Sequence, residues 1–179
     1  LSSSSAASDV YKRQVYVFNH SDRDLTDYLE RLKKAIDKED VKVVQCKAVE
    51  ELVRNSDIIC TTTPSTTPVL PDDKELLRGK CIIAIGSYMP EMREIPDAVL
   101  DLVDNVYIEL PYACEESGDL SQPLASGKLT KDRVKLMHEY LVSGEKEIKE
   151  GQTTYFKSVG MGLFDVCIAQ KLYEVAKEK

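Results

Sequence analysis

The sequence predicts an α/β protein built around a doubly wound parallel sheet. Short runs rich in β-branched and aromatic residues alternate with amphipathic helical segments, which is the pattern of repeated strand–helix–strand units. Of the 179 residues, 42% are hydrophobic and 31% are charged, which suits one domain of ordinary size with a packed core. Polar and small residues follow the apolar runs, at the strand ends where open parallel sheets bind ligands.

Five strands are expected where the apolar runs are short and β-rich, at residues 15–19, 41–46, 57–63, 80–86 and 105–110. After the first run, Ser21 and Asp24 match a helix-capping box, and leucines at helical spacing predict a helix over 22–38. A short helix is expected over 48–56. Thr130 can cap a helix that runs to residue 142, and residues 153–179 predict a loop that opens into a long C-terminal helix with a broad apolar face.

The first fourteen residues, "LSSSSAASDVYKRQ", differ in composition from the rest of the chain. They contain four consecutive serines and lack the apolar core of a secretory signal. We interpret residues 1–14 as a foreign leader, such as a fusion scar or an assembly join, and exclude them from the fold.

Charge and cysteine usage exclude several classes of function. The net charge of −7 argues against a nucleic acid or an anionic membrane as the main partner. No apolar run approaches the ~20 residues that a membrane span needs. The five cysteines are widely spaced and form neither a CxxC pair nor a Cys/His cluster. We therefore expect buried free thiols in a reducing compartment, the cytoplasm, and no metal site.

The segment after the first expected strand could hold a nucleotide ribose. An acidic residue there would bind the ribose 2′-hydroxyl and repel a 2′-phosphate. Asn19 is neutral, and His20, Ser21 and Arg23 can donate hydrogen bonds. Ser21 would also present a helix N-terminus, which favours an anion. These residues favour NADP over NAD, and the alternative is an ordinary capped turn.

Further polar residues are candidates for chemistry. The Thr/Ser/Pro loop at 61–68 could line a ribose, and Lys157 and Ser158 could hold an anionic or carboxamide group. In "EESGDL" (115–120), Asp119 could be a general acid/base or could equally cap the helix that follows. Residues alone leave these alternatives open.

Four stretches together resemble one family. "ELVRNSDIICTTTPSTTPVL", "IIAIGSYMPEMREI", "EESGDL" and "TYFKSVGMGLFDVCIAQKLYE" are similar, in order and spacing, to the ornithine cyclodeaminase/mu-crystallin family, over residues 15–177. The "FKSVGMG" and "NHS" segments are closer to its mu-crystallin and ketimine-reductase side. The resemblance implies a Rossmann-type NAD(P)-binding domain over 15–155 and the C-terminal helix of a substrate and dimerisation domain over 156–179, in a protein that is a homodimer when full length.

The resemblance also implies the site. The members pass hydride between a nicotinamide and the carbon–nitrogen bond of a small amino or cyclic imino acid, as in ketimine reduction or the conversion of ornithine to proline. The implied cofactor is NADP, with NAD as the alternative. The residues that match cofactor-binding segments are Asn19, His20, Ser21, Arg23, Cys46, Ala48, Thr62, Thr63, Pro64, Lys157, Ser158 and Val159. Tyr88, Met89 and Glu116 match substrate-facing positions, and Asp119 matches the aspartate that acts as acid/base in cyclodeaminases.

The first strand, the glycine loop and the N-terminal substrate region of the family have no counterpart in this sequence. We therefore expect a truncated member of the family that is inactive as a separate chain. Two other interpretations stay open. One is a non-catalytic, mu-crystallin-like protein that binds NADP and a small ligand, and the other is a fragment without function of its own.

Overall fold

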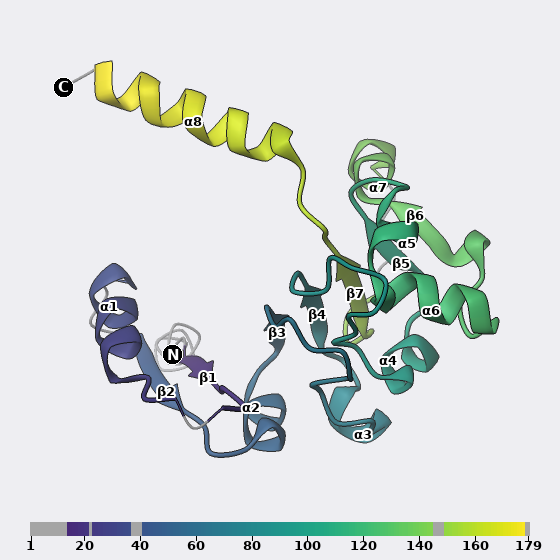
Figure 1. The fold of residues 1–179 in the computed structure, drawn as a ribbon, viewed down its shortest axis with the longest axis horizontal. Coiled ribbons are helices and arrows are strands. Elements are labelled where there is room, and N and C mark those ends of the chain that lie inside the picture. Colours follow the sequence, from purple (N-terminus) through teal and green to yellow (C-terminus); the bar gives the residue numbers. More distant parts are fainter. Residues whose placement is uncertain (1–13, 22, 37–40, 145–148, 178–179) are drawn as a thin grey trace, which may run out of the picture. The chain divides into compact units, whose positions relative to one another are not determined.

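The computed structural model describes residues 14–21, 23–36, 41–144 and 149–177, and the chain divides into two compact units, Leu1–Ser56 and Asp57–Lys179. Both units pair their strands in parallel and alternate them with helices, which confirms the predicted α/β class (Figure 1). From the sequence we expect residues 15–155 to form one partial domain, whereas in the structure the chain divides into two compact units after Ser56. The leader predicted at 1–14 lies outside the described residues, except for Gln14, which begins the first strand.

The first unit contains a two-stranded parallel sheet. Strand β1 (Gln14–Val17) pairs with β2 (Lys42–Gln45), and the last register pair is Val17 with Gln45. Helix α1 (Thr26–Ile36) lies between the strands in the chain, and α2 (Val49–Asn55) follows β2. The carboxyl ends of both strands therefore lie at one edge of this small sheet.

Helix α1 begins at Thr26 rather than at residue 22. The carboxylate of Asp24 accepts hydrogen bonds from the Thr26 hydroxyl (2.6 Å) and the Thr26 backbone N–H (2.9 Å), and these bonds lower the pKa of Asp24. The Ser21 hydroxyl instead accepts a hydrogen bond from the Asn19 side chain at 3.0 Å. The predicted capping box at Ser21 is wrong. Because α1 begins at Thr26, its N-terminus gives no support to an anion site at Ser21.

The second unit contains a five-stranded sheet in the order β3-β4-β7-β5-β6, and every neighbouring pair is parallel. The strands are β3 (Ile58–Thr61), β4 (Cys81–Ala84), β5 (Val106–Ile108), β6 (Val134–Leu136) and β7 (Thr154–Lys157). The helices are α3 (Lys74–Leu77), α4 (Asp97–Leu102), α5 (Ala113–Glu116), α6 (Gly118–Ser126), α7 (Met137–Ser143) and α8 (Gly162–Lys177).

The sequence misses two of these five strands. Residues 153–158 are expected as a loop, but "TYFK" forms β7, the central strand of the sheet. The helix expected from Thr130 to residue 142 is also wrong in its first half. A short 3₁₀ turn (Lys131–Arg133) leads into β6, and only α7 is α-helical there.

One face of the five-stranded sheet is buried across β3, β4, β7 and β5, and β5 is buried on both faces. Ile59, Ile82, Tyr155 and Val106 occupy one register row and are at most 2% exposed. Ile58, which points to the opposite face because side chains alternate along a strand, is 65% exposed. The row two residues further along the strands points to the same buried face, and it begins with Thr61 on β3.

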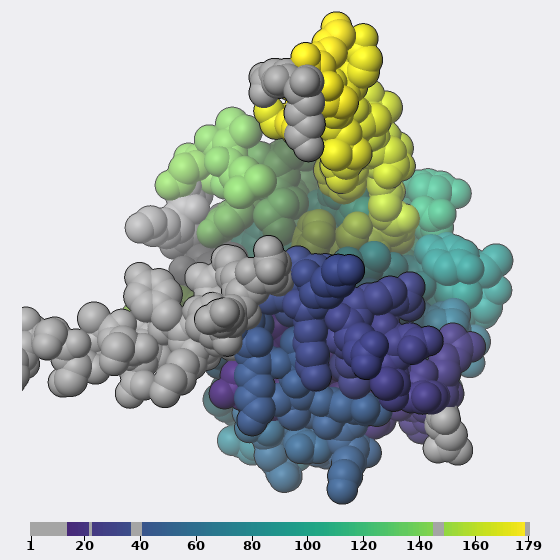
Figure 2. All heavy atoms as spheres, turned by 90° about the vertical axis from the view of Figure 1, so that its left-hand side faces the viewer, coloured from purple at the N-terminus to yellow at the C-terminus, as the bar shows by residue number. Residues whose placement is uncertain are grey.

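Helix α8 confirms the predicted C-terminal helix, and all of its residues are exposed. Figure 2 shows its side chains, in yellow, at the surface along the helix. The exposed apolar side chains are Leu163, Phe164, Val166, Ile168, Leu172, Tyr173 and Val175.

The cysteines agree only in part with the expectation of buried free thiols. All five cysteines are free, but only Cys46 is buried, and Cys60 and Cys167 are exposed. Within the described ranges there is no cluster of His, Cys, Asp and Glu that could hold a metal ion. None of the described helices combines the length and apolar character that crossing a membrane requires.

Candidate active site

Parallel pairing brings the carboxyl ends of four strands of the second unit to one edge. Thr61, Ala84, Lys157 and Ile108 occupy the last register row of β3, β4, β7 and β5. The loops that follow these strands contain most of the predicted site residues of this unit. This is the edge at which open parallel sheets bind ligands.

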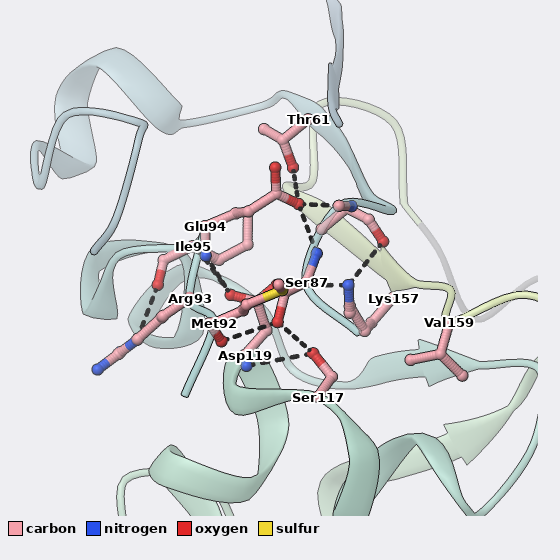
Figure 3. A network of polar contacts seen from close by, with 12 residues as sticks. Thr61, Ser87, Met92, Arg93, Glu94, Ile95, Ser117, Asp119, Lys157 and Val159 are labelled. Carbon is pink, nitrogen blue, oxygen red and sulfur yellow. Dashed lines mark hydrogen bonds and ion pairs between the residues drawn. The ribbon is translucent and has the colours of Figure 1, made fainter. Parts of the chain in front are cut away.

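The buried side chain of Glu94 joins the loop after β3 to the loop after β4 (Figure 3). One oxygen, Oε1, accepts hydrogen bonds from the Thr63 backbone N–H (2.5 Å) and hydroxyl (2.8 Å). The other, Oε2, accepts from the Thr61 hydroxyl (2.9 Å) and from the backbone N–H groups of Gly86 (2.8 Å) and Ser87 (3.3 Å). Because its donors come from the end of β3, from the loop after β3 and from its own loop after β4, this carboxylate anchors both loops.

Gly86 permits the close approach of these two loops. A Cβ at this position would lie 2.2 Å from both the backbone nitrogen and the carbonyl oxygen of Thr63. No side chain fits there, so the glycine is a steric requirement of the site.

Asp119 lies in the first turn of α6 and is 1% exposed. Its Oδ1 accepts hydrogen bonds from the backbone N–H groups of Glu94 (2.7 Å) and Ile95 (2.9 Å). The cap of α6 is Ser117, whose hydroxyl accepts from the Asp119 backbone N–H at 3.3 Å. Asp119 therefore does not cap the helix, and its carboxylate is bonded to a neighbouring loop.

Lys157 ends the central strand and is fully buried. Its Nζ lies 3.5 Å from Asp119 Oδ2 and donates to the carbonyl oxygen of Ala84 at 3.4 Å. Burial lowers the pKa of Lys157, against the opposite effect of the Asp119 charge, and burial raises the pKa of Asp119. Both shifts reflect the cost of holding charge away from water, which this long contact offsets only in part.

Glu109 follows β5 and shapes the turn after β7. Its Oε1 accepts hydrogen bonds from the Ser158 hydroxyl (2.8 Å) and from the backbone N–H groups of Val159 (2.7 Å) and Gly160 (2.9 Å). Gly160 has a φ of +87°, a left-handed conformation that glycine adopts without strain. One carboxylate oxygen of Glu109 thus accepts hydrogen bonds from three donors of this turn.

The start of α6 contacts the loop that carries Tyr88 and Met89. The Ser117 and Ser87 hydroxyls lie 2.8 Å apart, and the Gly118 backbone N–H donates to the Met89 carbonyl at 3.0 Å. Tyr88 and Met89 themselves are 51% and 42% exposed. The loop backbone is held firmly while these two side chains are accessible.

The predicted residues of the first unit lie at the carboxyl edge of the β1–β2 sheet. Asn19, His20 and Ser21 are exposed after β1. Cys46 is buried after β2, where its backbone N–H donates to the Val17 carbonyl at 2.8 Å. The exposed Arg23 and Ala48 complete the predicted set of this unit.

Residues 7–179 match the sequence profile described as "Ornithine cyclodeaminase/mu-crystallin family". The chain belongs to the ornithine cyclodeaminase/mu-crystallin family.

Two similar sequences support this membership, and one solved structure shows the same fold. A Delta(1)-pyrroline-2-carboxylate reductase of Bacillus cereus is 37% identical over 136 residues, 74% of this chain and 41% of the relative. The ketimine reductase mu-crystallin of Rattus norvegicus is 34% identical over 75% of this chain and 40% of its own length. The structure of Thermococcus litoralis Delta(1)-pyrroline-2-carboxylate reductase, in complex with NADH and L-proline, has a TM-score of 0.78 at 20% identity and covers 93% of this chain and 51% of that chain. The chain thus spans about half the length of its relatives or less.

In this family member, the predicted residues of the second unit come from four segments: Thr62–Pro64, Tyr88 with Met89, Asp119 at the start of α6, and Lys157–Val159 at the end of β7. Glu116 ends α5 and is half-buried. Sequence reasoning missed the two carboxylates that hold the loops, Glu94 and Glu109. Glu109 could have been found as an acidic residue directly after a strand, whereas Glu94 lies within an unremarkable loop.

Proposed function

We propose that this chain supplies the dinucleotide-binding part of an NAD(P)-dependent reductase or cyclodeaminase that acts on a small amino or cyclic imino acid. The observation that carries this proposal is the set of loops at the carboxyl edge of the parallel sheet, held by Glu94 and Glu109. Family membership supports a nicotinamide cofactor at this edge, and such a cofactor would supply the hydride chemistry. The contribution of the protein is to bind and orient the cofactor.

In the second unit, Thr62, Thr63, Pro64 and the Lys157–Val159 segment are the proposed cofactor contacts. Exposed residues follow β3, and Glu94 fixes the backbone beneath them. Because Glu109 occupies the N–H groups of Val159 and Gly160, the turn has few donors left for an anion. We expect it to accept hydrogen bonds instead, which suits the amide N–H₂ of a carboxamide.

In the first unit, Asn19, His20, Ser21 and Arg23 are the proposed contacts of a 2′-phosphorylated ribose, and Cys46 and Ala48 those of the adenine. Support comes from the exposed donors after β1 and from the absence of an acidic side chain at Asn19, His20 and Ser21. These features favour NADP over NAD.

Tyr88 and Met89 are the proposed substrate contacts, because they are exposed on a loop whose backbone is fixed. Glu116 is proposed as a neighbouring contact. The acid/base role of Asp119 stays a prediction, because its carboxylate is buried and bonded to backbone N–H groups. The apolar side chains of α8 support the proposal that the whole protein is a homodimer.

A second function, a non-catalytic protein that binds NADP and a small ligand, is favoured by the burial of Asp119, whose carboxylate is bonded to backbone N–H groups. A non-catalytic protein that holds NADP and a small ligand needs fewer groups than an enzyme. Binding and turnover therefore have to be measured separately.

The test is to titrate this chain with NADPH and NADH and to follow NADPH oxidation with Δ1-pyrroline-2-carboxylate. Saturable dinucleotide binding supports the proposal, and turnover adds catalysis by this chain. Binding without turnover favours the binding protein. If neither dinucleotide binds to the folded chain, the proposal fails.

A further inference from the structure

The carboxylate of Asp119 makes contacts that differ from those of an accessible general acid. Its side chain is fully buried, and Oδ1 is shared between two backbone N–H groups, those of Glu94 and Ile95. Its Oδ2 has no hydrogen-bond partner among the described residues and lies 3.5 Å from Lys157 Nζ. A proton carrier needs hydrogen-bond reach to the group that it serves, directly or through one water. The contacts of the Asp119 carboxylate are instead with buried groups of the protein itself.

The two backbone N–H groups that donate to Asp119 belong to Glu94 and Ile95, in the loop after β4. Glu94 is the residue whose carboxylate joins the loop after β3 to the loop after β4. Because Asp119 holds the backbone of Glu94, it fixes where that carboxylate lies. Figure 3 shows these contacts in sequence, from Asp119 to Glu94 to Thr61.

The other contacts at the start of α6 act on the same loop. The Ser87 hydroxyl donates to the Met92 carbonyl (2.8 Å) and lies 2.8 Å from the Ser117 hydroxyl. The Gln122 side chain donates to the Pro90 carbonyl at 2.8 Å. A Cβ on Gly118 would lie 2.1 Å from the Met92 carbonyl oxygen, so only glycine permits this approach. Residues 117–122 thus form a clamp, here called the α6 clamp, on residues 87–95.

We infer that Asp119 is a positioning residue: as part of the α6 clamp it holds residues 87–95, and with them Tyr88 and Met89, through hydrogen bonds to the backbone. Its function at the site requires an acceptor oxygen and does not require a titrating proton. The clamp itself follows from the contacts alone, and its consequence for substrate rests on the proposed function.

Two substitutions separate this role from acid/base catalysis. Asp119→Asn retains a carbonyl oxygen that can accept from Glu94 and Ile95, whereas Asp119→Ala removes it. Amide hydrogen-exchange rates of the ligand-free chain report directly on the hydrogen bonds of the α6 clamp. We expect Asp119→Ala to speed exchange at Glu94 and Ile95 by at least about tenfold, and Asp119→Asn to keep both near wild type.

Two further variants serve as controls. Glu115→Ala removes an exposed carboxylate from the same motif and should leave exchange in residues 87–95 unchanged. Asp119→Ala combined with Lys157→Met removes the buried charge that the single variant leaves unpaired. Fast exchange at Glu94 and Ile95 should persist in this double variant, because the lost hydrogen bonds and not the stranded charge cause it.

Where NADPH-dependent turnover is present, kinetics give a second readout. A positioning role predicts that Asp119→Asn keeps the pH–rate profile and most of kcat, whereas Asp119→Ala loses both substrate affinity and rate. A general acid/base predicts that both variants lose about 10²- to 10⁴-fold in kcat, together with one limb of the profile. That result, or wild-type exchange in Asp119→Ala, would overturn the inference. Failure of dinucleotide binding would instead reject the proposed function and leave the exchange contrast intact.

Discussion

Single buried carboxylates hold the candidate site together. Glu94, Glu109 and Asp119 each use an oxygen to accept from two or three donors of a neighbouring loop. Charge-assisted hydrogen bonds are roughly twice as strong as neutral ones, and leaving a buried donor unpaired is costly. We therefore expect substitutions of these three residues to have large effects that experiments can distinguish.

Replacement of Glu94 should be strongly destabilising. Glu94→Ala leaves the N–H groups of Thr63, Gly86 and Ser87 without their acceptor, so we expect a loss of at least about 3 kcal/mol in the free energy of unfolding. Chemical denaturation measures it. Glu91→Ala, an exposed change in the same loop, should stay within about 0.5 kcal/mol of wild type. Equal effects of the two variants would contradict the anchoring role.

Asp119 gives the stability a particular pH dependence. Burial raises its pKa above the ordinary 3.8, so the folded chain binds this proton more tightly than the unfolded chain. The contribution of Asp119 to stability is therefore present at low pH and is lost as the pH rises through the folded pKa. As the pH rises through the folded pKa of Asp119, the free energy of unfolding of the wild type should fall relative to that of Asp119→Asn. Denaturation of both proteins from about pH 3 upward measures the difference, and an opposite slope would disprove the raised pKa.

Asn19 should set the choice of cofactor. Asn19→Asp places a carboxylate where the proposed 2′-phosphate binds, so NADPH affinity should fall at least about tenfold while NADH affinity is kept or rises. Fluorescence titration with both dinucleotides provides the measurement. Asp27→Asn, an exposed charge change within α1, is the matched control. An unchanged preference in Asn19→Asp would remove Asn19 from the site.

At the scale of elements, apolar runs predicted β1 to β5, and helical spacing predicted α8. The sequence did not reveal β7 or β6. Polar threonines and Lys157 flank the short "TYF" core of β7, and β6 has only three residues, so neither has a periodic pattern to detect. The anchoring role of Glu94 was also hidden, because it is recognisable only once parallel pairing brings distant loops together. Glu109 has a signal in the sequence, since it is an acidic residue directly after a strand.

The close packing of the loops after β3 and β4 can be tested at Gly86. Gly86→Ala puts a Cβ 2.2 Å from the Thr63 backbone, so the variant should lose several kcal/mol or fail to fold. Gly162→Ala is the matched control, since a Cβ there meets no atom within 4 Å and alanine favours the helix. Thermal melts compare them. A neutral Gly86→Ala would show that the two loops are further apart than described.

In the molecule as a whole, α8 exposes many large apolar side chains, and an exposed apolar patch is typical of an interaction surface. The proposed homodimer would bury it. Leu172→Glu should therefore shift the chain toward monomer in sedimentation velocity, while Lys171→Glu, a charge change beside it, should not. A wild-type chain that stays monomeric at all accessible concentrations would contradict a dimer formed through this helix by the chain alone.

The proposed function requires a dinucleotide site within a chain about half the length of its relatives or less. Calorimetric titration of the cooperatively folded chain with NADPH and then NADH tests this most directly. We expect saturable binding of both dinucleotides, with NADPH the tighter ligand. A chain that melts cooperatively and yet binds neither dinucleotide would contradict it.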